Sequence, residues 1–97
     1  MPLLQISLEE LENWKHEAGK DFILVDVREP NEHKDYNIGG ILVPLSEFSK
    51  HTEVFDTDLP VVFYCQRGIR SQIAIQRLVR RFPDGKFYNL TKGVKHE

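Results

Sequence analysis

Short apolar runs alternate with amphipathic and polar stretches along the whole chain. In order from the N-terminus, the runs read LLQIS, FILVDV, ILVPL, LPVVFYC and KFYNL. Continuous apolar runs of this length, rich in β-branched residues, predict strands that are buried on both faces of a sheet. We therefore expect five strands, the second over residues 22–27 and the fourth ending at Cys65, with Pro60 at its edge or start.

The stretches between the apolar runs predict helices. In the segment SLEE, Ser7 and Glu10 fit a capping box, in which each side chain satisfies a free backbone donor of the other residue. A helix over residues 8–16 is expected to follow, with Leu11 and Trp14 on its apolar face together with Leu8.

Three further helical segments are expected. Pro30 fits the first position of a short helix in REPNEHKDY, where its missing N–H costs nothing. The turn NIGG follows, and Ser46 is expected to cap one helical turn in SEFSKH. The third helix follows Cys65 and ends before the turn PDG. Its residues expected to face the core are Ile69, Ile73, Leu78, Val79 and Phe82.

Alternation of strands and helices predicts an α/β domain with a mostly parallel five-stranded sheet and helices on both faces. A chain of 97 residues favours one domain, and we expect it to span residues 1–97. In such sheets, ligands bind beyond the carboxyl ends of the strands. Cys65 stands at one of these ends.

Composition excludes several classes of protein. The apolar share of 40% and the charged share of 29% are those of an ordinary globular domain. The net charge is −2, whereas a nucleic-acid-binding domain needs a basic excess. No apolar run approaches the length that spans a bilayer, and no basic segment followed by an apolar one marks a secretion signal. We expect no nucleic-acid or membrane partner.

Cysteine and histidine usage points to an intracellular protein without a metal. A single cysteine forms no disulfide within the chain, which is typical of a reducing compartment, so a cytoplasmic location is expected. The four histidines are scattered in polar surroundings with no partner at ligand spacing, and we expect surface positions for them: His16, His33, His51 and His96. No metal and no organic cofactor are implied.

The stretch VVFYCQRGIRSQIAI places the only cysteine between a strand and a helix. The free N–H groups of a helix N-terminus favour an anion there, and Arg67 and Arg70 add two permanent cations. Gly68 permits a positive φ, so that successive N–H groups can point inward. Because the thiolate is the nucleophile, these features describe a reactive Cys65 that attracts an anionic substrate. The alternative is a buried cysteine that acts as a small hydrophobic residue. That reading leaves the glycine and both arginines unexplained.

Five segments resemble the rhodanese-like sulfurtransferases, in the order of that family. CQRGIRS is similar to the active-site loop Cys-x-x-Gly-x-Arg-Ser, and ILVDVREPNEH to the segment Leu-(Ile/Val)-Asp-Val-Arg-Glu-x-x-Glu. NIGGILVPL resembles Gly-x-x-Ile-Pro-Leu, PVVFYC the strand before the loop, and FYNLTKGV the closing Val-x-x-Leu-x-Gly-Gly. The resemblance covers residues 7–94, nearly the whole chain.

The resemblance implies a sulfur-transfer mechanism. Cys65 would attack the outer sulfur of a small anionic donor such as thiosulfate and hold that sulfur as a persulfide. A thiol, cyanide or a protein would then accept it. Arg70 matches the family's loop arginine and would hold the donor's oxygens, while Arg67 would help through its charge alone. Backbone N–H groups from Gln66 to Ser71 would stabilise the persulfide anion, and Ser71 is also expected to cap the helix. The expected donor-binding set is Gln66, Arg67, Gly68, Ile69, Arg70 and Ser71.

Other parts of the resemblance imply structural roles or departures. Asp26 and Arg28 match a family element that is structural, an ion pair near the loop rather than a catalytic group. NIGGI is one residue shorter than the family's His-Ile-Pro-Gly-Ala, and Lys92 replaces the first closing glycine. We expect the family's C-terminal helix to be short or absent. The chain is then either a fragment of a longer protein or complete. A complete chain is expected to be a monomer, or a weak homodimer in which the second copy covers this edge.

Three other functions remain open. Phosphatases and arsenate reductases of related fold have five residues between cysteine and arginine, whereas four separate Cys65 from Arg70 here, which favours a sulfur atom over a phosphate. Binding modules of this fold often lack the cysteine that this chain keeps. A sulfur relay would dock a protein, and Arg77, Arg80 and Arg81 form either its docking face or a solvated face.

Overall fold

The helices and strands follow the order expected from the sequence. The computed structural model describes residues 4–94. Its elements are β1 (Leu4–Ile6), α1 (Leu8–His16), β2 (Ile23–Asp26), α2 (Pro30–Asp35), β3 (Ile41–Leu42), η1 (Leu45–Lys50), η2 (Thr52–Phe55), β4 (Val61–Tyr64), α3 (Ile69–Arg81) and β5 (Phe87–Leu90). Where one helical turn was expected after β3, the chain forms the two successive 3-10 helices η1 and η2.

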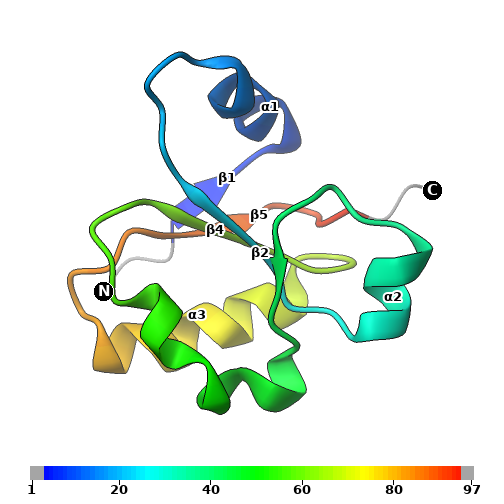
Figure 1. Ribbon diagram of the computed structural model, residues 1–97, viewed down its shortest axis with the longest axis vertical. Coiled ribbons are helices and arrows are strands. Elements are labelled where there is room, and N and C mark those ends of the chain that lie inside the picture. The colour runs from blue at the N-terminus through cyan, green and yellow to red at the C-terminus, as the bar shows by residue number, and fades with distance from the viewer. Residues whose placement is uncertain (1–3, 95–97) are drawn as a thin grey trace.

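The strands form one five-stranded sheet in which every described pair is parallel (Figure 1). Its strand order is β1-β5-β4-β2-β3. The register aligns Val25 of β2 with Phe63 of β4, and Val61 of β4 with Phe87 of β5. The α/β architecture with a parallel five-stranded sheet is therefore confirmed. Since parallel strands end at the same edge, the carboxyl ends of β2, β4 and β5 lie together.

Helices cover both faces of the sheet. Successive β4 side chains point to opposite faces and therefore enter two separate cores. Val61 and Phe63 belong to the cluster that includes residues of α3, η1 and η2, whereas Val62 and Tyr64 belong to the cluster that includes α1. Figure 1 shows α1 on one side of the sheet and α3 with the 3-10 helices on the other. All four β4 side chains are buried, as the continuous apolar run predicted.

The helix starts follow the expected capping chemistry. The Glu10 N–H donates to the Ser7 Oγ at 3.1 Å, and the Ser7 N–H donates to the Glu10 Oε1 at 3.0 Å, so the predicted capping box is confirmed. Pro30 begins α2, also as predicted. A second reciprocal contact, missed in the sequence, joins the Glu29 N–H to the Glu32 Oε1 at 3.0 Å.

The expected cap at Ser46 is wrong. Pro44 precedes η1 and no side chain caps its start, while Ser46 lies inside the helix. The Ser46 hydroxyl instead donates to the Glu29 Oε2 at 2.9 Å, 17 residues away in the sequence. The Ser46 hydroxyl therefore bonds to a carboxylate distant in the sequence, and not to a backbone N–H at the helix start as the local sequence pattern predicted.

The expected burial of Ile69 and Ile73 is also wrong, since their exposed fractions are 64% and 37%. A surface helix buries one stripe of side chains against its sheet. In α3 that stripe is Ser71, Ala74, Ile75 and Leu78. Ile69 and Ile73 therefore project from the opposite side of α3.

Within residues 4–94, no helix combines the length and the apolar content needed to cross a membrane. Residues 91–94 form turns. The C-terminal helix that was expected to be short or absent falls outside the described residues.

Candidate active site

Cys65 directly follows the carboxyl end of β4, and residues 66–68 connect it to α3. Gly68 precedes the first residue of α3 and has φ 87°, a conformation that favours glycine. A Cβ at this position would lie 3.3 Å from the Leu90 carbonyl oxygen and from the Lys92 N–H nitrogen. The glycine therefore lets the loop turn sharply while it packs against the end of β5.

The Cys65 sulfur is buried and surrounded by donors. The Gly68 N–H donates to Sγ at 3.0 Å, the Ser71 N–H donates at 3.4 Å, and the Ser71 hydroxyl lies at 3.4 Å. Burial alone would raise the pKa of the Cys65 thiol. The contacts with the Ser71 hydroxyl and with the backbone N–H groups of Ser71, Arg67 and Gly68 outweigh burial, so the pKa lies below its ordinary value.

Ser71 is the third residue of α3, and not its N-terminal cap, which is Gly68. The Ser71 hydroxyl donates to the Asn89 Oδ1 on β5, and the Asn89 amide donates to the Gln5 Oε1 at 3.1 Å. A hydroxyl has one proton, which can go either to the Asn89 oxygen or to the sulfur. Ionisation of Cys65 would draw it to the sulfur.

Arg70 lies beside the thiol, but its guanidinium is paired with α2. Its Nη1 and Nη2 donate to the two carboxylate oxygens of Glu32, both at 2.8 Å. Hydrogen bonds from Arg70 lower the pKa of Glu32 to about 2. The same contact raises the pKa of Arg70, and the nearby Cys65 adds to that shift. The Glu32 carboxylate thus occupies the two-pronged edge of the guanidinium near Cys65.

The other expected donor-binding residues surround the opening above the sulfur. A cleft of about 280 Å³ is lined by Cys65, Gln66, Arg67, Ile69 and Arg70. The Arg67 side chain is exposed and makes no hydrogen bond within residues 4–94. Its backbone N–H contributes to the low pKa of Cys65. The structure therefore brings the predicted loop residues together. Their side chains line the cleft, whereas their backbone N–H groups face the sulfur.

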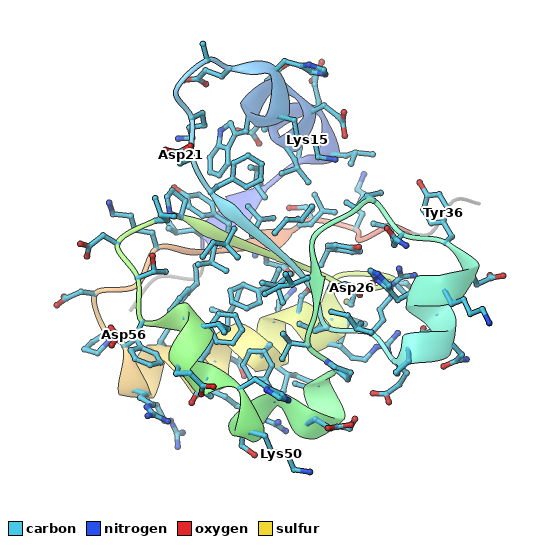
Figure 2. The ribbon with its side chains drawn as sticks, viewed as in Figure 1. Lys15, Asp21, Asp26, Tyr36, Lys50 and Asp56 are labelled. Carbon is cyan, nitrogen blue, oxygen red and sulfur yellow. The ribbon has the colours of Figure 1, made fainter. Side chains whose placement is uncertain are left out.

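A buried ion pair supports the loop from β2. The Asp26 and Arg28 side chains are 0% and 3% exposed, and the Arg28 Nη2 donates to the Asp26 Oδ2 at 2.9 Å. Arg28 also donates to the Gln66 Oε1 at 3.2 Å and to the Tyr36 carbonyl at 2.5 Å. Figure 2 shows Asp26 in the interior beside α2. The arrangement agrees with the structural role expected for Asp26 and Arg28.

His33 differs from the surface position expected for all four histidines. Its Nδ1 lies 2.8 Å from the Asp26 Oδ2, and its side chain is 25% exposed. His16 and His51 are exposed as expected, and His96 falls outside the described residues. Within residues 4–94, no group of three or more metal-ligating side chains comes together.

Gly93 is a further residue that the sequence motif did not explain. Its φ is 66°, and a Cβ there would lie 2.4 Å from the Cys65 carbonyl oxygen and 2.5 Å from the Gln66 carbonyl oxygen. The next residue, Val94, donates its N–H to the Cys65 carbonyl at 3.0 Å. The segment after β5 therefore closes against the cysteine loop, and only glycine permits the approach.

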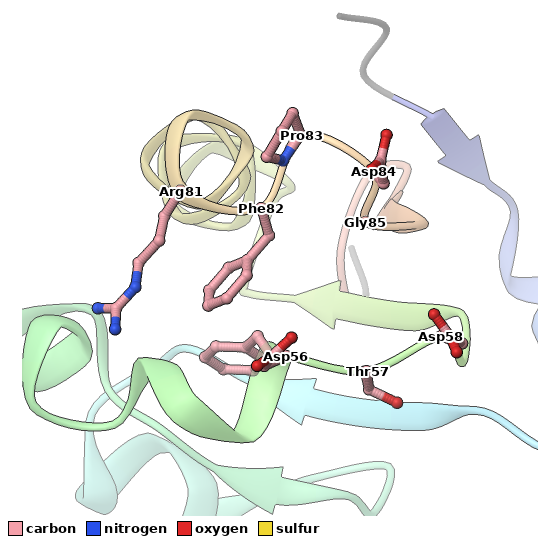
Figure 3. Close-up of a pocket in the computed structure, with 9 residues that line it drawn as sticks. Asp56, Thr57, Asp58, Arg81, Phe82, Pro83, Asp84 and Gly85 are labelled. Atoms are coloured by element: carbon pink, nitrogen blue, oxygen red, sulfur yellow. The ribbon is translucent and has the colours of Figure 1, made fainter.

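A second cleft of about 270 Å³ lies at the other end of α3 (Figure 3). Figure 3 shows Asp56, Asp58 and Asp84 around it, with the Arg81 side chain at one side. The Arg81 Nη1 donates to the Thr52 Oγ1 at 2.7 Å. This cleft contains no thiol, so the opening above Cys65 is the candidate active site.

The comparisons with known proteins place the chain in a family. A family model described as the rhodanese-like domain matches residues 7–96. The chain belongs to the rhodanese-like domain family, as the sequence motifs indicated.

Three relatives define the likeness more closely. The Bacillus subtilis protein YqhL is 42% identical over 73 residues, which are 74% of this chain and 57% of YqhL. The thiosulfate sulfurtransferase GlpE of Coxiella burnetii is 31% identical over 72 residues, 73% of this chain and 67% of GlpE. The crystal structure of reduced Bacillus anthracis CoADR-RHD has a TM-score of 0.80 and 30% identity, covering 96% of this chain and 16% of that protein. The chain thus spans little more than half of YqhL and a small part of CoADR-RHD.

We predict that Asp26→Asn destabilises the protein by about 3 kcal/mol, because it leaves the buried Arg28 charge uncompensated. Urea denaturation followed by circular dichroism measures the change. Asp35→Asn, which alters an exposed carboxylate at the end of α2, is the matched control and should change stability by less than about 0.5 kcal/mol. Equal unfolding midpoints for the two variants would contradict the role given to Asp26.

The same ion pair sets a pH dependence. Burial opposes ionisation of Asp26, but hydrogen bonds from Arg28 and His33 hold its pKa below the ordinary value. Its stabilisation is therefore present above the unfolded pKa of about 3.9 and is lost as the pH falls through the lower folded value. Acidification from pH 5 to pH 2 should narrow the stability gap between the wild type and Asp26→Asn.

Proposed function

We propose that this chain is a sulfurtransferase that carries a sulfane sulfur as a persulfide on Cys65. The observation that supports this most directly is the buried sulfur with N–H donors at 3.0 and 3.4 Å and a lowered thiol pKa. Such donors stabilise a thiolate before attack and a persulfide anion after it. Membership in the rhodanese-like family and the likeness to GlpE agree with this chemistry.

The proposed first step is displacement at the outer sulfur of thiosulfate or a similar anionic donor. The Cys65 thiolate supplies an electron pair to that sulfur, and a new S–S bond forms. The S–S bond of the donor breaks, and sulfite leaves with the bonding pair. In the second step an acceptor thiolate attacks the outer sulfur of the persulfide and regenerates the Cys65 thiolate. No proton or external oxidant is consumed.

Arg70 is proposed to bind the oxygens of the donor. Its guanidinium is the cation whose charge reaches Cys65, and planar two-pronged pairing suits an oxyanion as well as a carboxylate. Because Glu32 already occupies that edge at 2.8 Å, the donor must share or displace Glu32. Glu32 is therefore proposed to weaken the binding of dianionic donors.

A reducing compartment suits this reaction. A persulfide is transferred to thiols, and the acceptor must be reduced to attack it. The cytoplasm, expected from the lone cysteine, meets this requirement and is the location that we propose.

Cys65→Ser is predicted to abolish sulfur loading. Incubation of the wild type with thiosulfate should add the mass of one sulfur atom, and a reductant should remove it. Intact mass spectrometry measures both changes. The serine variant should keep its circular dichroism spectrum and show no adduct. A wild type that gains no sulfur from thiosulfate or polysulfide, or a serine variant with near wild-type sulfur transfer, would refute the proposal.

Arg70→Ala is predicted to lower kcat/KM for thiosulfate by about 10- to 100-fold, because charge-assisted hydrogen bonds contribute about 1.5–3 kcal/mol. Steady-state sulfur transfer to cyanide measures the effect. Arg77→Ala, on the exposed part of α3, is the matched control and should retain wild-type kinetics. Unchanged thiosulfate kinetics in Arg70→Ala would show that Arg70 does not bind the donor.

Glu32→Gln should change thiosulfate kinetics in the opposite direction. The amide keeps the oxygen that accepts the Glu29 N–H but removes the charge that competes for Arg70. A partly exposed ion pair contributes about 0.2–1 kcal/mol, so KM should fall by up to about fivefold with little change in kcat. A higher KM would instead mean that Glu32 serves to orient Arg70. Arg70→Ala should remove any effect of Glu32→Gln, which a double-mutant cycle tests.

A further inference from the structure

The outward side of α3 carries a continuous strip of exposed residues that begins at the candidate active site. We call it the α3 strip, and it consists of Ile69, Ile73, Gln76, Arg77 and Arg80. Their spacing by three and four residues places them on one side of the helix, opposite the buried stripe. A groove of about 380 Å³ runs over its last four members. Ile69, one turn before Ile73, lines the cleft above Cys65.

The charge of the strip differs from that of the rest of the chain. The sequence contains no acidic residue between Asp58 and Asp84, and this interval holds five of the six arginines. The chain as a whole has a net charge of −2. Within residues 4–94, neither Arg77 nor Arg80 makes an ion pair or a side-chain hydrogen bond. A concentrated positive field with unpaired arginines attracts an acidic partner.

The strip also has an apolar part next to the nucleophile. Ile69 is 64% exposed and Ile73 is 37% exposed, one turn apart. Aliphatic anchors beside a basic surface are typical of protein recognition, in which a few buried apolar contacts supply most of the binding energy. Single-stranded nucleic acids require aromatic platforms for their bases, and the strip has none.

The position of the sulfur explains why an acceptor needs such a surface. Cys65 as a whole residue is 1% exposed, so a macromolecular acceptor reaches its persulfide only with a thiol on a protruding segment. The flanks of that segment then lie on the start of α3.

We propose that the α3 strip docks the protein acceptor of the persulfide, and that the acceptor presents its thiol on a segment with acidic and aliphatic residues. This inference rests on the proposed sulfur-transfer function. Arginines of the strip pair with the acidic side chains, and an aliphatic side chain of the acceptor packs against Ile69 and Ile73. Sulfur moves to the acceptor thiol as in the second step above.

Synthetic peptides of equal length test the proposal. Each has one central cysteine: the first is flanked by Glu and Leu, the second by Lys and Leu, and the third by Glu and Ser. Cys65 is loaded with thiosulfate, excess donor is removed, and mass spectrometry follows persulfide formation on each peptide. The Glu–Leu peptide should react about tenfold faster than the Lys–Leu peptide at low salt. The preference should shrink at about 0.5 M salt, where surface charges are screened.

Two double variants with the same charge change separate docking from general electrostatics. Arg77→Glu with Arg80→Glu reverses charge on the strip, whereas Arg81→Glu with Lys86→Glu reverses it outside the strip, at the last residue of α3 and just before β5. For each variant, the rate with the Glu–Leu peptide is divided by the rate with the Lys–Leu peptide, and this ratio is compared with the wild-type ratio. The intrinsic effect of flanking charge on the peptide thiol is the same in every ratio and cancels. The first variant should lose or invert the preference for Glu, and the second should keep it. Ile73→Ser should slow the Glu–Leu peptide several-fold and leave the Glu–Ser peptide unchanged.

The loading step distinguishes failure of docking from failure of the proposed function. Every variant should load sulfur from thiosulfate like the wild type, because none of these four charged residues or Ile73 lines the Cys65 cleft. If the wild type loads sulfur but transfers it equally to all three peptides, the docking proposal is wrong and the sulfurtransferase proposal stands. Equal effects of both double variants would overturn docking. Docking would also be overturned if the wild type formed a dimer in solution that Arg77→Glu with Arg80→Glu dissociates, since the strip would then bind a second copy. The same holds if an RNA oligonucleotide inhibits sulfur transfer selectively while the three peptides react equally.

Discussion

The buried pair of Asp26 and Arg28 fixes the relation between the sheet, α2 and the cysteine loop. Asp26 lies at the end of β2 and accepts from the backbone N–H and side chain of Arg28, and His33 of α2 contacts the same carboxylate. Arg28 reaches the Tyr36 carbonyl after α2 and Gln66 in the loop. Desolvating two charges is costly unless their remaining hydrogen-bonding groups are satisfied. Within residues 4–94, no buried side-chain nitrogen or oxygen lacks a partner.

The thiol is activated mainly by oriented N–H groups and a hydroxyl, rather than by the two arginines that the sequence placed near it. Arg67 extends into solvent and Arg70 is paired with Glu32. Fixed N–H dipoles need no reorganisation when the thiolate forms. Because N–H groups and hydroxyls are neutral, they stabilise the thiolate without using the positive charge that an anionic substrate requires. Of the two loop arginines, Arg67 alone has a side chain without a hydrogen bond within residues 4–94, because Arg70 already donates to Glu32. The geometry requires glycine at two places, Gly68 at the start of α3 and Gly93 against the Cys65 carbonyl.

Much of this fold was predictable because its signals are local. The apolar runs gave the five strands, and the capping box at Ser7 gave the start of α1. The strand–glycine–helix pattern located Cys65 at the sheet edge. The errors arose where a distant residue decides the outcome. Ser46 bonds to Glu29 instead of capping its helix, and the direction of Ile69 depends on which stripe of α3 meets the sheet.

The parts of the site that the sequence missed are contacts between segments far apart in the chain. Asn89 orients Ser71 from β5, and Glu32 reaches Arg70 across 38 residues. Neither pairing has a local signature, since each requires the strand order that sets β5 beside β4 and α2 beside the loop. For the proposed sulfurtransferase, the topology lets one sulfur serve as both buried nucleophile and carrier. Because donors hold Sγ from the loop side, an added sulfur would extend by about 2 Å into the cleft. The reacting atom would thus lie nearer the opening lined by Ile69 and Arg67, while Cys65 itself stays in place.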